Sequence, residues 1–598
     1  MTDVRILDII SIMAKKHPSA QAFSQAEVTK KYGIPKSVIH KYFPREQMRS
    51  IRARSGRRLS FPVWTDEQIQ QLVRRSDIAK AIEQTRNDQA AERQRREAEA
   101  LFASYSPDAL IQRARTLDRA FVLHVGPTNS GKTYGALEDL KQHTPGCYLA
   151  PLRLLALEMF DKLNDAGVPC SMVTGEESIL IPGADNISST IELCDYTRRF
   201  KTAVIDEAQL IADPERGAAW LKAICLVNAE VVHVCMAPEA LTYLERLVRA
   251  FDAPYTVQKH ERLCPLTFSG SVHGYEDLQK DDAIICFSRK SVLSTAAHLE
   301  RNGFRASVIY GALPPEARRN EVRKYLAGET NIVVATDAIG MGISLPIRRV
   351  IFAETEKFDG KEFRSLNTAE INQIGGRAGR YGMHEKGEVL VLGKDTAIGD
   401  KLGNQVRAIR AGCISFPREA LRTDIPLSIL LKVWQAMPRR SDFVREDMRE
   451  PLSLLRMLKN ETNADQELLF DLITCPVDSR NEELLRYWAR CARAILHGRR
   501  IPRPYFETET LAGCELQYKA YDVHHQLLRR IGKPDDCSQE RAAICERIAE
   551  LMRESKAPYI RRCRQCGREL PIGTIWNDCD RCREQTDHAV RLPRYRKP

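Results

Sequence analysis

A glycine-rich octapeptide is the feature that most constrains how this chain can fold. The segment GPTNSGKT, Gly126 to Thr133, follows an apolar run at 120–125 and precedes a helical pattern, TYGALEDLKQ. In this order of strand, loop and helix, backbone N–H groups can surround phosphate oxygens at a helix N-terminus. The segment therefore predicts an α/β fold that binds a nucleotide, with Lys132 at the outer phosphates and the Thr133 hydroxyl on Mg²⁺. We assign nucleotide contacts to the whole loop, namely Gly126, Pro127, Thr128, Asn129, Ser130, Gly131, Lys132 and Thr133.

A pair of acidic residues follows a later strand pattern, TAVIDEAQ. Phosphoryl transfer at such a loop needs a carboxylate that holds the metal ion and a second group that positions the attacking water. We therefore predict that Asp206 binds Mg²⁺ and that Glu207 orients or deprotonates the water.

The segment QIGGRAGR offers the positive charge that a lysine and a metal ion leave uncompensated. An arginine from another domain is a common means of stabilising this transition state. The spacing of Gln373, Arg377 and Arg380 predicts that all three lie on one face of a helix. That face could point across a cleft at the terminal phosphate.

A turn pattern, VVATDAIGMGISLP, lies upstream of this segment. Such a turn can contact a sugar–phosphate backbone and a nucleotide together, although the pattern alone is not specific. We assign Thr336 to the nucleic-acid strand and Asp337 and Gly340 to the nucleotide.

The alternation of apolar runs and helical patterns predicts two α/β domains. The alternation starts near residue 119, breaks at 262–270, restarts, and fades beyond about residue 400. Near-continuous Val, Ile and Ala runs are typical of parallel sheets that are covered on both faces. We therefore predict an N-terminal helical basic region at 1–117, α/β domains at 118–265 and 266–400, a helical region at 401–555, and a cysteine-bearing tail at 556–598.

The positive charge is uneven along the chain. The net charge of +12 is compatible with a polyanionic partner, and the segment 44–58 holds six arginines against one glutamate. Residues 24–43 show two short helical patterns around Tyr-Gly-Ile-Pro, which resembles a helix-turn-helix. A nucleic-acid-docking unit and a plain helical subdomain both stay open for this region.

The cysteine content and the N-terminus bear on location. No stretch reaches the roughly 18 apolar residues of a membrane span, and the N-terminus does not read as a secretory signal. Seventeen cysteines without an export signal favour a reducing compartment. We expect a cytoplasmic protein with no membrane partner, and an organelle matrix is the alternative.

Four cysteines near the C-terminus have the spacing of a zinc ribbon. The pattern is C-x2-C, twelve residues, C-x2-C, which can deliver four thiolates to a tetrahedral metal ion. Iron is the minor alternative to Zn²⁺. Arginines surround the cysteines, and either a nucleic-acid contact or a folding staple would fit. The predicted ligands are Cys563, Cys566, Cys579 and Cys582.

In order along the chain, the motifs GPTNSGKT, APLRLLA, VTGEE, DEAQ, CFSRK, VIYGALPP, VATDAIGMG and QIGGRAGR resemble the core of superfamily-two helicases. More narrowly, HVGPTNSGKTY, AGVPCSMVTGEE and VATDAIGMGISLPIRRVIF resemble the suppressor-of-var-three-like ATP-dependent RNA helicases of the mitochondrial degradosome, here as a bacterial-type member with a zinc ribbon. The resemblance covers about residues 120–530. It implies two RecA-like domains, ATP hydrolysis coupled to 3′-to-5′ unwinding of single-stranded or partly duplex RNA, and an exoribonuclease partner.

The resemblance also implies roles for individual residues. The catalytic set would be Lys132, Asp206, Glu207, Gln373, Arg377 and Arg380. The strand path would be lined by Pro151, Leu152, Arg153, Thr174, Gly175 and Thr190 in the first domain, and by Ser288, Arg289 and Thr336 in the second. The chain departs from the family pattern at Gln209 and at Met236-Ala237-Pro238, where hydroxyls thought to link hydrolysis to unwinding are missing. Strand separation is therefore less supported than ATP hydrolysis.

Two other functions remain open on the sequence. A DNA helicase or translocase in repair would use the same motifs, because they do not read the sugar. A nucleic-acid-binding scaffold with a vestigial ATPase is the third reading, and the intact lysine, acidic pair and arginines argue against it.

Overall fold

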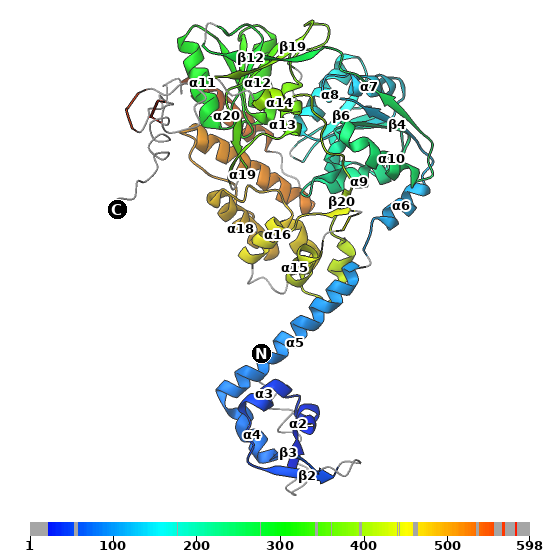
Figure 1. Ribbon diagram of the computed structural model, residues 1–598, viewed down its shortest axis with the longest axis vertical. Coiled ribbons are helices and arrows are strands. Elements are labelled where there is room, and N and C mark those ends of the chain that lie inside the picture. The colour runs from blue at the N-terminus through cyan, green and yellow to red at the C-terminus, as the bar shows by residue number, and fades with distance from the viewer. Residues whose placement is uncertain are drawn as a thin grey trace, which may run out of the picture. The chain divides into compact units, whose positions relative to one another are not determined.

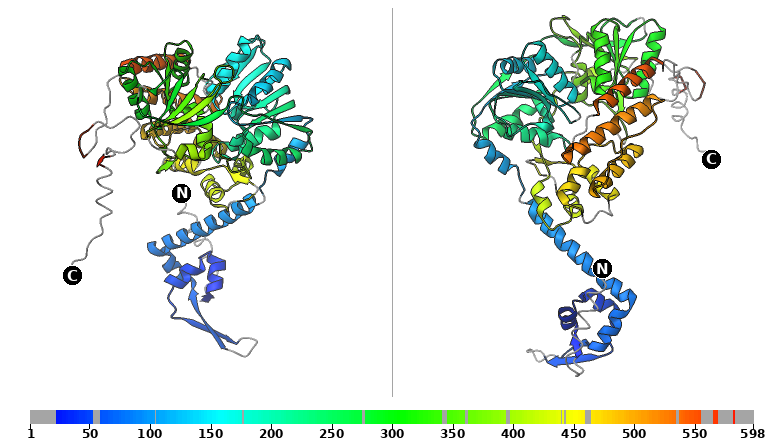
Figure 2. Two further views of the ribbon diagram at one scale, coloured as in Figure 1. Left: turned by 45° about the horizontal axis from the view of Figure 1, so that its top comes forward. Right: turned by 180° about the vertical axis from the view of Figure 1, so that it is seen from behind.

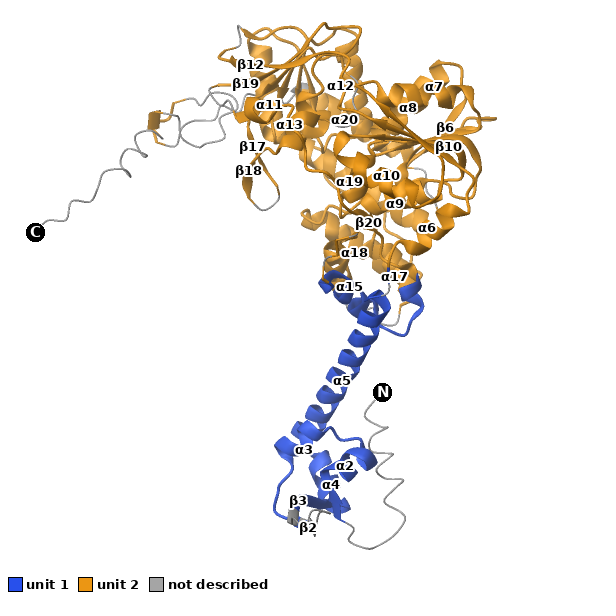
Figure 3. Ribbon diagram, turned by 45° about the vertical axis from the view of Figure 1, so that its right-hand side comes forward, with its two compact units in different colours: residues 1–105, 419–437 blue, residues 106–418, 438–598 orange. Residues whose placement is uncertain are grey.

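The computed structural model describes most of the chain. The described residues are 22–52, 58–103, 105–175, 177–274, 277–340, 345–359, 362–393, 397–438, 440–441, 443–458, 464–533, 537–554, 565–568 and 581–582. Two compact units are distinguished, residues 1–105 with 419–437 and residues 106–418 with 438–598 (Figure 3). Among the described helices, none is both long enough and apolar enough to cross a bilayer.

The first unit joins a small mixed α/β domain to a long helix. Sequence analysis expected helices here, and the structure adds a three-stranded antiparallel sheet in the order β1-β3-β2 (Figure 1). Val28, Ile39, Trp64 and Ile69 are among the buried side chains of its core. The elements are β1 (Ala22–Ser24), α2 (Gln25–Tyr32), α3 (Lys36–Tyr42), β2 (Met48–Arg52), β3 (Arg58–Thr65), α4 (Asp66–Arg74), α5 (Ser76–Ala103) and α15 (Leu427–Ala436).

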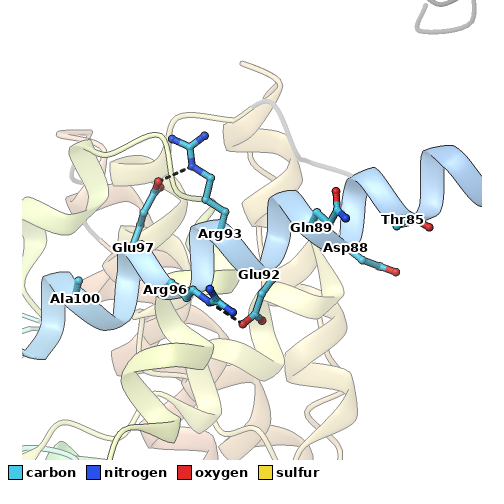
Figure 4. A pocket seen from close by; sticks show the side chains of 8 residues that line it. All are labelled: Thr85, Asp88, Gln89, Glu92, Arg93, Arg96, Glu97 and Ala100. Carbon is cyan, nitrogen blue, oxygen red and sulfur yellow. Dashed lines mark hydrogen bonds and ion pairs between the residues drawn. The ribbon is translucent and has the colours of Figure 1, made fainter. Parts of the chain in front are cut away.

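Helix α5 is apolar only near its two ends. Ile78 and Ile82 are buried in the core of the small domain, and Phe102 stacks edge-on against Trp434 of α15 with ring centroids 5.3 Å apart. The middle carries ion pairs one turn apart, among them those drawn in Figure 4, which stabilise an exposed helix. A shallow depression of about 640 Å³ runs along this stretch, and α5 alone lines it, so it is an open helix face and not an enclosed site.

The second unit contains two α/β lobes, seen as separate layered bodies in Figure 2. The first lobe has an eight-stranded sheet in the order β11-β4-β10-β9-β5-β8-β6-β7, parallel except at β7. Its strands are β4 (Ala120–Val125), β5 (Gly146–Ala150), β6 (Cys170–Val173), β7 (Ser178–Ile179), β8 (Asn186–Thr190), β9 (Phe200–Ile205), β10 (Ala229–Met236) and β11 (Tyr255–Lys259). Its helices are α6 (Asp108–Arg115), α7 (Lys132–Gln142), α8 (Arg153–Asp165), α9 (Gly217–Leu226) and α10 (Leu241–Arg249), with short turns η1 (Ile191–Leu193), η2 (Ala208–Ala212) and η3 (Pro238–Ala240).

The second lobe has a six-stranded parallel sheet in the order β12-β19-β16-β13-β15-β14. Its strands are β12 (Leu266–Val272), β13 (Asp282–Ile285), β14 (Ala306–Ile309), β15 (Ile332–Ala335), β16 (Arg349–Phe352) and β19 (Gly387–Leu392). A hairpin of β17 (Glu356–Phe358) and β18 (Phe363–Ser365) lies outside this sheet. Its helices are α11 (Arg289–Arg301), α12 (Pro315–Leu326), α13 (Thr368–Gly375) and α14 (Ala397–Lys401), with the turn η5 (Asp337–Gly340).

Helices near the C-terminus complete the second unit. Tyr518 of α19 and Ile548 of α20 share one hydrophobic core with Val308 and Leu313 of the second lobe. The two helices are therefore part of that lobe's packing rather than a detached addition. The remaining elements are β20 (Gly412–Ile414), β21 (Phe443–Arg445), α16 (Arg449–Met457), α17 (Gln466–Ile473), α18 (Glu482–Leu496), α19 (Leu511–Arg530) and α20 (Ser538–Glu554), while the turn η6 (Arg418–Arg422) leads into the first unit.

Candidate active site

The glycine-rich loop connects β4 to α7, as the sequence predicts. Two buried polar groups at this loop are poorly satisfied. Among the described residues, the Ser130 hydroxyl has no hydrogen-bond partner. The Lys132 ammonium donates one long hydrogen bond to a described residue, 3.4 Å to the Pro127 carbonyl. Buried donors are normally paired, so both groups fit the phosphate oxygens of a nucleotide.

Asp206 and Thr133 meet at the carboxyl end of β9. The Thr133 hydroxyl lies 3.3 Å from Asp206 Oδ1, and the Tyr148 hydroxyl donates to Asp206 Oδ2 at 2.8 Å. Burial raises the pKa of Asp206, and the neighbouring Glu207 charge raises it further. A divalent cation would favour the ionised carboxylate, so the hydroxyl and carboxylate oxygens are a suitable donor set for Mg²⁺.

Gln209 connects the acidic pair to the next strand. Its amide nitrogen donates to Glu207 Oε2, while its carbonyl oxygen accepts the Ala237 N–H at 3.1 Å, just beyond β10. A glutamine can do both because its amide carries a donor and an acceptor, whereas an ionised aspartate has only acceptors. Gln209 and the segment 236–238, which the sequence predicted to be departures from the family pattern, are thus in direct contact.

Arg377 of the second lobe lies in the electric field of the first lobe's carboxylates. Its guanidinium donates to the Gly340 carbonyl, with Nε at 3.1 Å. Burial lowers the pKa of Arg377, whereas the charges of Glu207 and Asp206 raise it. Gln373 lies against Gly340 as well. The structure therefore brings the predicted arginine and the predicted acidic pair to one place.

The prediction that Gln373, Arg377 and Arg380 share a helical face is wrong. Helix α13 ends at Gly375, and both arginines lie in the turn that follows it. Glycine is a poor helix former, and Gly379 adopts φ +70°, a left-handed conformation that interrupts a helix. The turn, rather than a helix face, presents the arginines.

The loop and this turn are in direct contact. Asn129 donates to the Gly376 carbonyl at 3.0 Å, and Arg262 donates to the carbonyls of Thr128 at 2.9 Å and Gly376 at 2.8 Å. A Cβ atom at Gly376 would lie 2.9 Å from Thr128 Cβ, so glycine permits this close approach. Arg262 carries no motif that marked it in the sequence.

The predicted strand-path residues lie near the carboxyl ends of parallel strands in both lobes. Arg153 is ion-paired with Glu177 at 2.7 Å and with Glu316 of the other lobe, and Arg289 is paired with Glu515 of α19. These guanidinium groups therefore have protein partners in this conformation. The other residues follow β5 (Pro151, Leu152), follow β6 (Thr174, Gly175), end β8 (Thr190), precede α11 (Ser288) or follow β15 (Thr336, with Asp337 and Gly340 in η5).

The cysteine tail is described only in part. Cys566 is exposed and Cys582 is buried, while Cys563 and Cys579 lie outside the described residues. No group of metal-binding side chains occurs among the residues that are described.

Comparison with known protein families identifies both lobes. Residues 107–260 match the family model described as the DEXQ-box helicase domain of Suv3, and residues 258–382 match the one described as the helicase conserved C-terminal domain. Residues 107–382 are a two-domain helicase core. Asp206, Glu207 and Gln209 supply the D, E and Q of the first description, so the expectation that Gln209 departs from the family pattern is wrong. The helicase core holds the glycine-rich loop in one domain and Arg377 in the other.

Curated relatives of the helicase core carry related names. The chain is 34% identical over 410 residues to "ATP-dependent RNA helicase SUV3, mitochondrial" of Candida albicans, over 64% of this chain and 57% of the relative. It is 40% identical over 316 residues to "ATP-dependent RNA helicase SUPV3L1, mitochondrial" of Mus musculus, over 50% and 40%. The chain spans about half the length of the curated relatives it matches. A solved structure of the DUF1998 helicase MrfA with DNA and AMPPNP matches at 17% identity over 61% of this chain and 59% of that chain, with a TM-score of 0.38.

The expectation of a cytoplasmic location is wrong by this comparison. The relatives are named as mitochondrial proteins. The sequence argument rested on abundant cysteines and a missing export signal, which indicate a reducing compartment. Those features do not separate the cytoplasm from an organelle matrix.

Proposed function

We propose that this chain is an ATP-driven RNA helicase that unwinds partly duplex RNA in the 3′-to-5′ direction. One observation carries the proposal: the glycine-rich loop of the first lobe contacts the arginine turn of the second, where Asn129 donates to the Gly376 carbonyl at 3.0 Å. Nucleotide hydrolysis at such a seam requires both lobes, so it can be coupled to their relative movement. The relatives named ATP-dependent RNA helicases, at 34–41% identity, support RNA over DNA.

Each residue of the seam has a proposed role. Lys132 and the N–H groups of the glycine-rich loop bind the phosphates of ATP, and Thr133 with Asp206 holds Mg²⁺, which would neutralise charge on them. Glu207 positions the attacking water and accepts its proton. Arg377 and Arg380 stabilise the charge of the transition state, with Gln373 beside them.

The strand path is proposed to run along the carboxyl ends of both sheets. Its lining residues are those predicted from the sequence, from Pro151 to Thr336. Because Arg153 and Arg289 are paired with carboxylates in this conformation, they would have to exchange partners to contact a phosphate. Such contacts read the backbone and weaken with salt.

The activity is tested by ATP turnover with single-stranded RNA and with single-stranded DNA, and by unwinding of duplexes with a 3′ or a 5′ overhang. We expect RNA to stimulate more than DNA, and only the 3′-tailed duplex to open. Glu207→Gln is the control, because it should bind ATP and RNA without turnover. Greater stimulation by DNA would contradict the RNA assignment.

We also propose a four-cysteine zinc ribbon at Cys563, Cys566, Cys579 and Cys582, as in a bacterial-type member of the resembled family. The spacing of the cysteines supports it. Cys566→Ser should release zinc on metal analysis and lower the thermal stability of the tail, while ATP binding by the helicase core stays unchanged. An unaltered zinc content in this variant would contradict the assignment.

An exoribonuclease partner is proposed from the family resemblance. Unwinding produces single-stranded RNA, which is the substrate of such an enzyme. Degradation of a 3′-tailed duplex by an added 3′-to-5′ exoribonuclease should depend on this chain and ATP, and should not occur with Glu207→Gln.

A further inference from the structure

The topology of the small N-terminal domain points to a second nucleic-acid site. The order is the strand β1, two helices joined by a tight turn, and the β2–β3 hairpin (Figure 3). Strand β3 of the hairpin pairs with β1. This is a helix-turn-helix followed by a β-hairpin wing. In such units the second helix and the hairpin project from the same core and can contact a duplex.

The turn between α2 and α3 is fixed firmly. Gly33 adopts φ +64°, where glycine has no steric cost, and it ends α2. Arg86 of α5 donates to the Gly33 carbonyl at 2.6 Å and to the Tyr32 carbonyl at 3.2 Å. Val38 and Ile39 anchor α3 in the core. The exposed side of α3 is therefore held in one orientation within the unit.

That exposed side carries hydrogen-bond donors. Lys36, Ser37, His40 and Lys41 are exposed, and α3 contains no carboxylate. Lys36, Lys41 and the following Arg45 make no ion pair with any described residue, although Lys41 lies over the Tyr42 ring. Lys31, by contrast, is tied to Asp66 at 3.2 Å. Helix α3 thus carries two exposed lysines that have no ion-pair partner among the described residues.

The hairpin that follows α3 along the chain is basic in sequence. Arg52 of β2 and Arg58 of β3 are direct partners in the register, and Arg49 is three residues earlier in β2. Glu46 is the one acidic residue between α3 and the end of β3.

We propose that α3 and the β2–β3 hairpin bind the phosphate backbone of a nucleic-acid duplex. Single-strand binders stack bases on exposed aromatic rings, and no aromatic is among the large exposed side chains in the described part of this unit. The major groove of B-form DNA admits a helix, whereas the protein would recognise A-form RNA by its shape and its phosphates. The site is independent of the ATP-binding seam, so it goes beyond the proposed helicase activity.

The test measures equilibrium binding of the full chain without ATP to duplex RNA, duplex DNA and single-stranded RNA, over a range of salt. Lys36→Ala/Lys41→Ala removes two charges from the proposed surface. Arg74→Ala/Lys80→Ala removes two exposed charges from α4 and α5 and is the matched control. Arg52→Ala/Arg58→Ala tests the hairpin separately.

Both test variants should bind at least one of the two duplexes roughly tenfold more weakly than the wild type, and the logarithmic salt slope should fall by about two. The duplex whose binding is weakened identifies the ligand as RNA or DNA. Binding of single-stranded RNA and ATP turnover should stay unchanged. Wild-type duplex affinity in both test variants, or an equal loss in the control, would overturn the proposal. If RNA does not stimulate ATP turnover by the wild type, only the helicase proposal is contradicted.

Discussion

Gln209 matches the Q of the DEXQ-box description, and its contacts show what an amide at this position does. The amide nitrogen donates a hydrogen bond to Glu207, and the amide oxygen accepts one from the Ala237 N–H just beyond β10. Position 237 needs no hydroxyl for this link, because its backbone N–H serves. The missing hydroxyls suggested that the acidic pair has no link to the segment after β10, and the Gln209 amide provides a hydrogen-bonded link between them.

Gln209→Met tests this connection. Methionine has a similar length but no amide, so Glu207 loses its donor and the Ala237 N–H loses its acceptor. We expect kcat for ATP to fall about tenfold with little change in nucleotide affinity, since each hydrogen bond contributes about 1 kcal/mol. The exposed Gln258→Met is the control, and equal kcat values for the two variants would contradict the role.

A chain of imidazoles lies behind the glycine-rich loop. His124 Nδ1 is 3.0 Å from His260 Nε2, His124 Nε2 is 2.8 Å from His233 Nδ1, and His233 Nε2 is 2.9 Å from Asp139 Oδ2. Burial lowers the pKa of His124 to about 4, with smaller contributions from His233 and His260. His124 is thus neutral in the folded protein at physiological pH.

This burial predicts a loss of stability in acid. The unfolded chain binds a proton at His124 near pH 6.5, whereas the folded chain does not until about pH 4, so the free energy of unfolding falls between these values. We expect the loss to be on the order of 1 kcal/mol per pH unit. Denaturant unfolding of His124→Gln should show a shallower loss, and the exposed His273→Gln should follow the wild type. Parallel curves for all three proteins would refute the assignment.

At the scale of elements, the parallel strands and their order of appearance were predictable. Each Val- and Ile-rich run in both lobes forms a strand, because burial on both faces leaves a plain apolar signature. Strands β8, β11 and β12 were among those missed, since NISST, YTVQK and LTFSGSV lack that signature, and β12 begins inside the break predicted at 262–270. Their place in the sheet comes from tertiary pairing, which a local pattern does not contain.

The site was predictable as a set of residues but not as a geometry. Fixed motif spacings located Lys132, Asp206 and Arg377. The end of α13 was missed because a three-residue interval fits both a helix and a glycine-rich turn. Contacts made by Arg262 and Tyr148 were missed because they join segments that are distant in sequence.

Gly376→Ala tests the contact between the loop and the arginine turn. The added methyl would meet both Thr128 of the loop and the Asn372 carbonyl oxygen of α13, so the arginine turn must shift away from the loop, at a cost of roughly 1–3 kcal/mol. We expect ATP turnover to fall tenfold or more. Gly311→Ala is the control, because open space surrounds that position and its backbone is unstrained. Equal turnover in both variants would show that the close approach is not needed.

At the scale of the second unit, polar contacts join the two lobes at two places. Asn129 and Arg262 bind the arginine turn, and Arg153 joins Glu316 beside Tyr518 of α19. These contacts hold the two lobes together across the proposed seam, and α19 packs on the second lobe. The proposed ATP hydrolysis requires this seam, since neither lobe holds the lysine, the acidic pair and the arginines together.

The most direct test is single-turnover ATP hydrolysis by Arg377→Ala beside Lys132→Ala and the wild type, with nucleotide affinity measured separately. We predict that Arg377→Ala binds ATP nearly as well as the wild type but hydrolyses it about 10³-fold or more slowly, because an arginine at this position stabilises only the transition state. Lys132→Ala should lose binding and turnover together. Hydrolysis by Arg377→Ala at the wild-type rate would contradict catalysis between the two lobes.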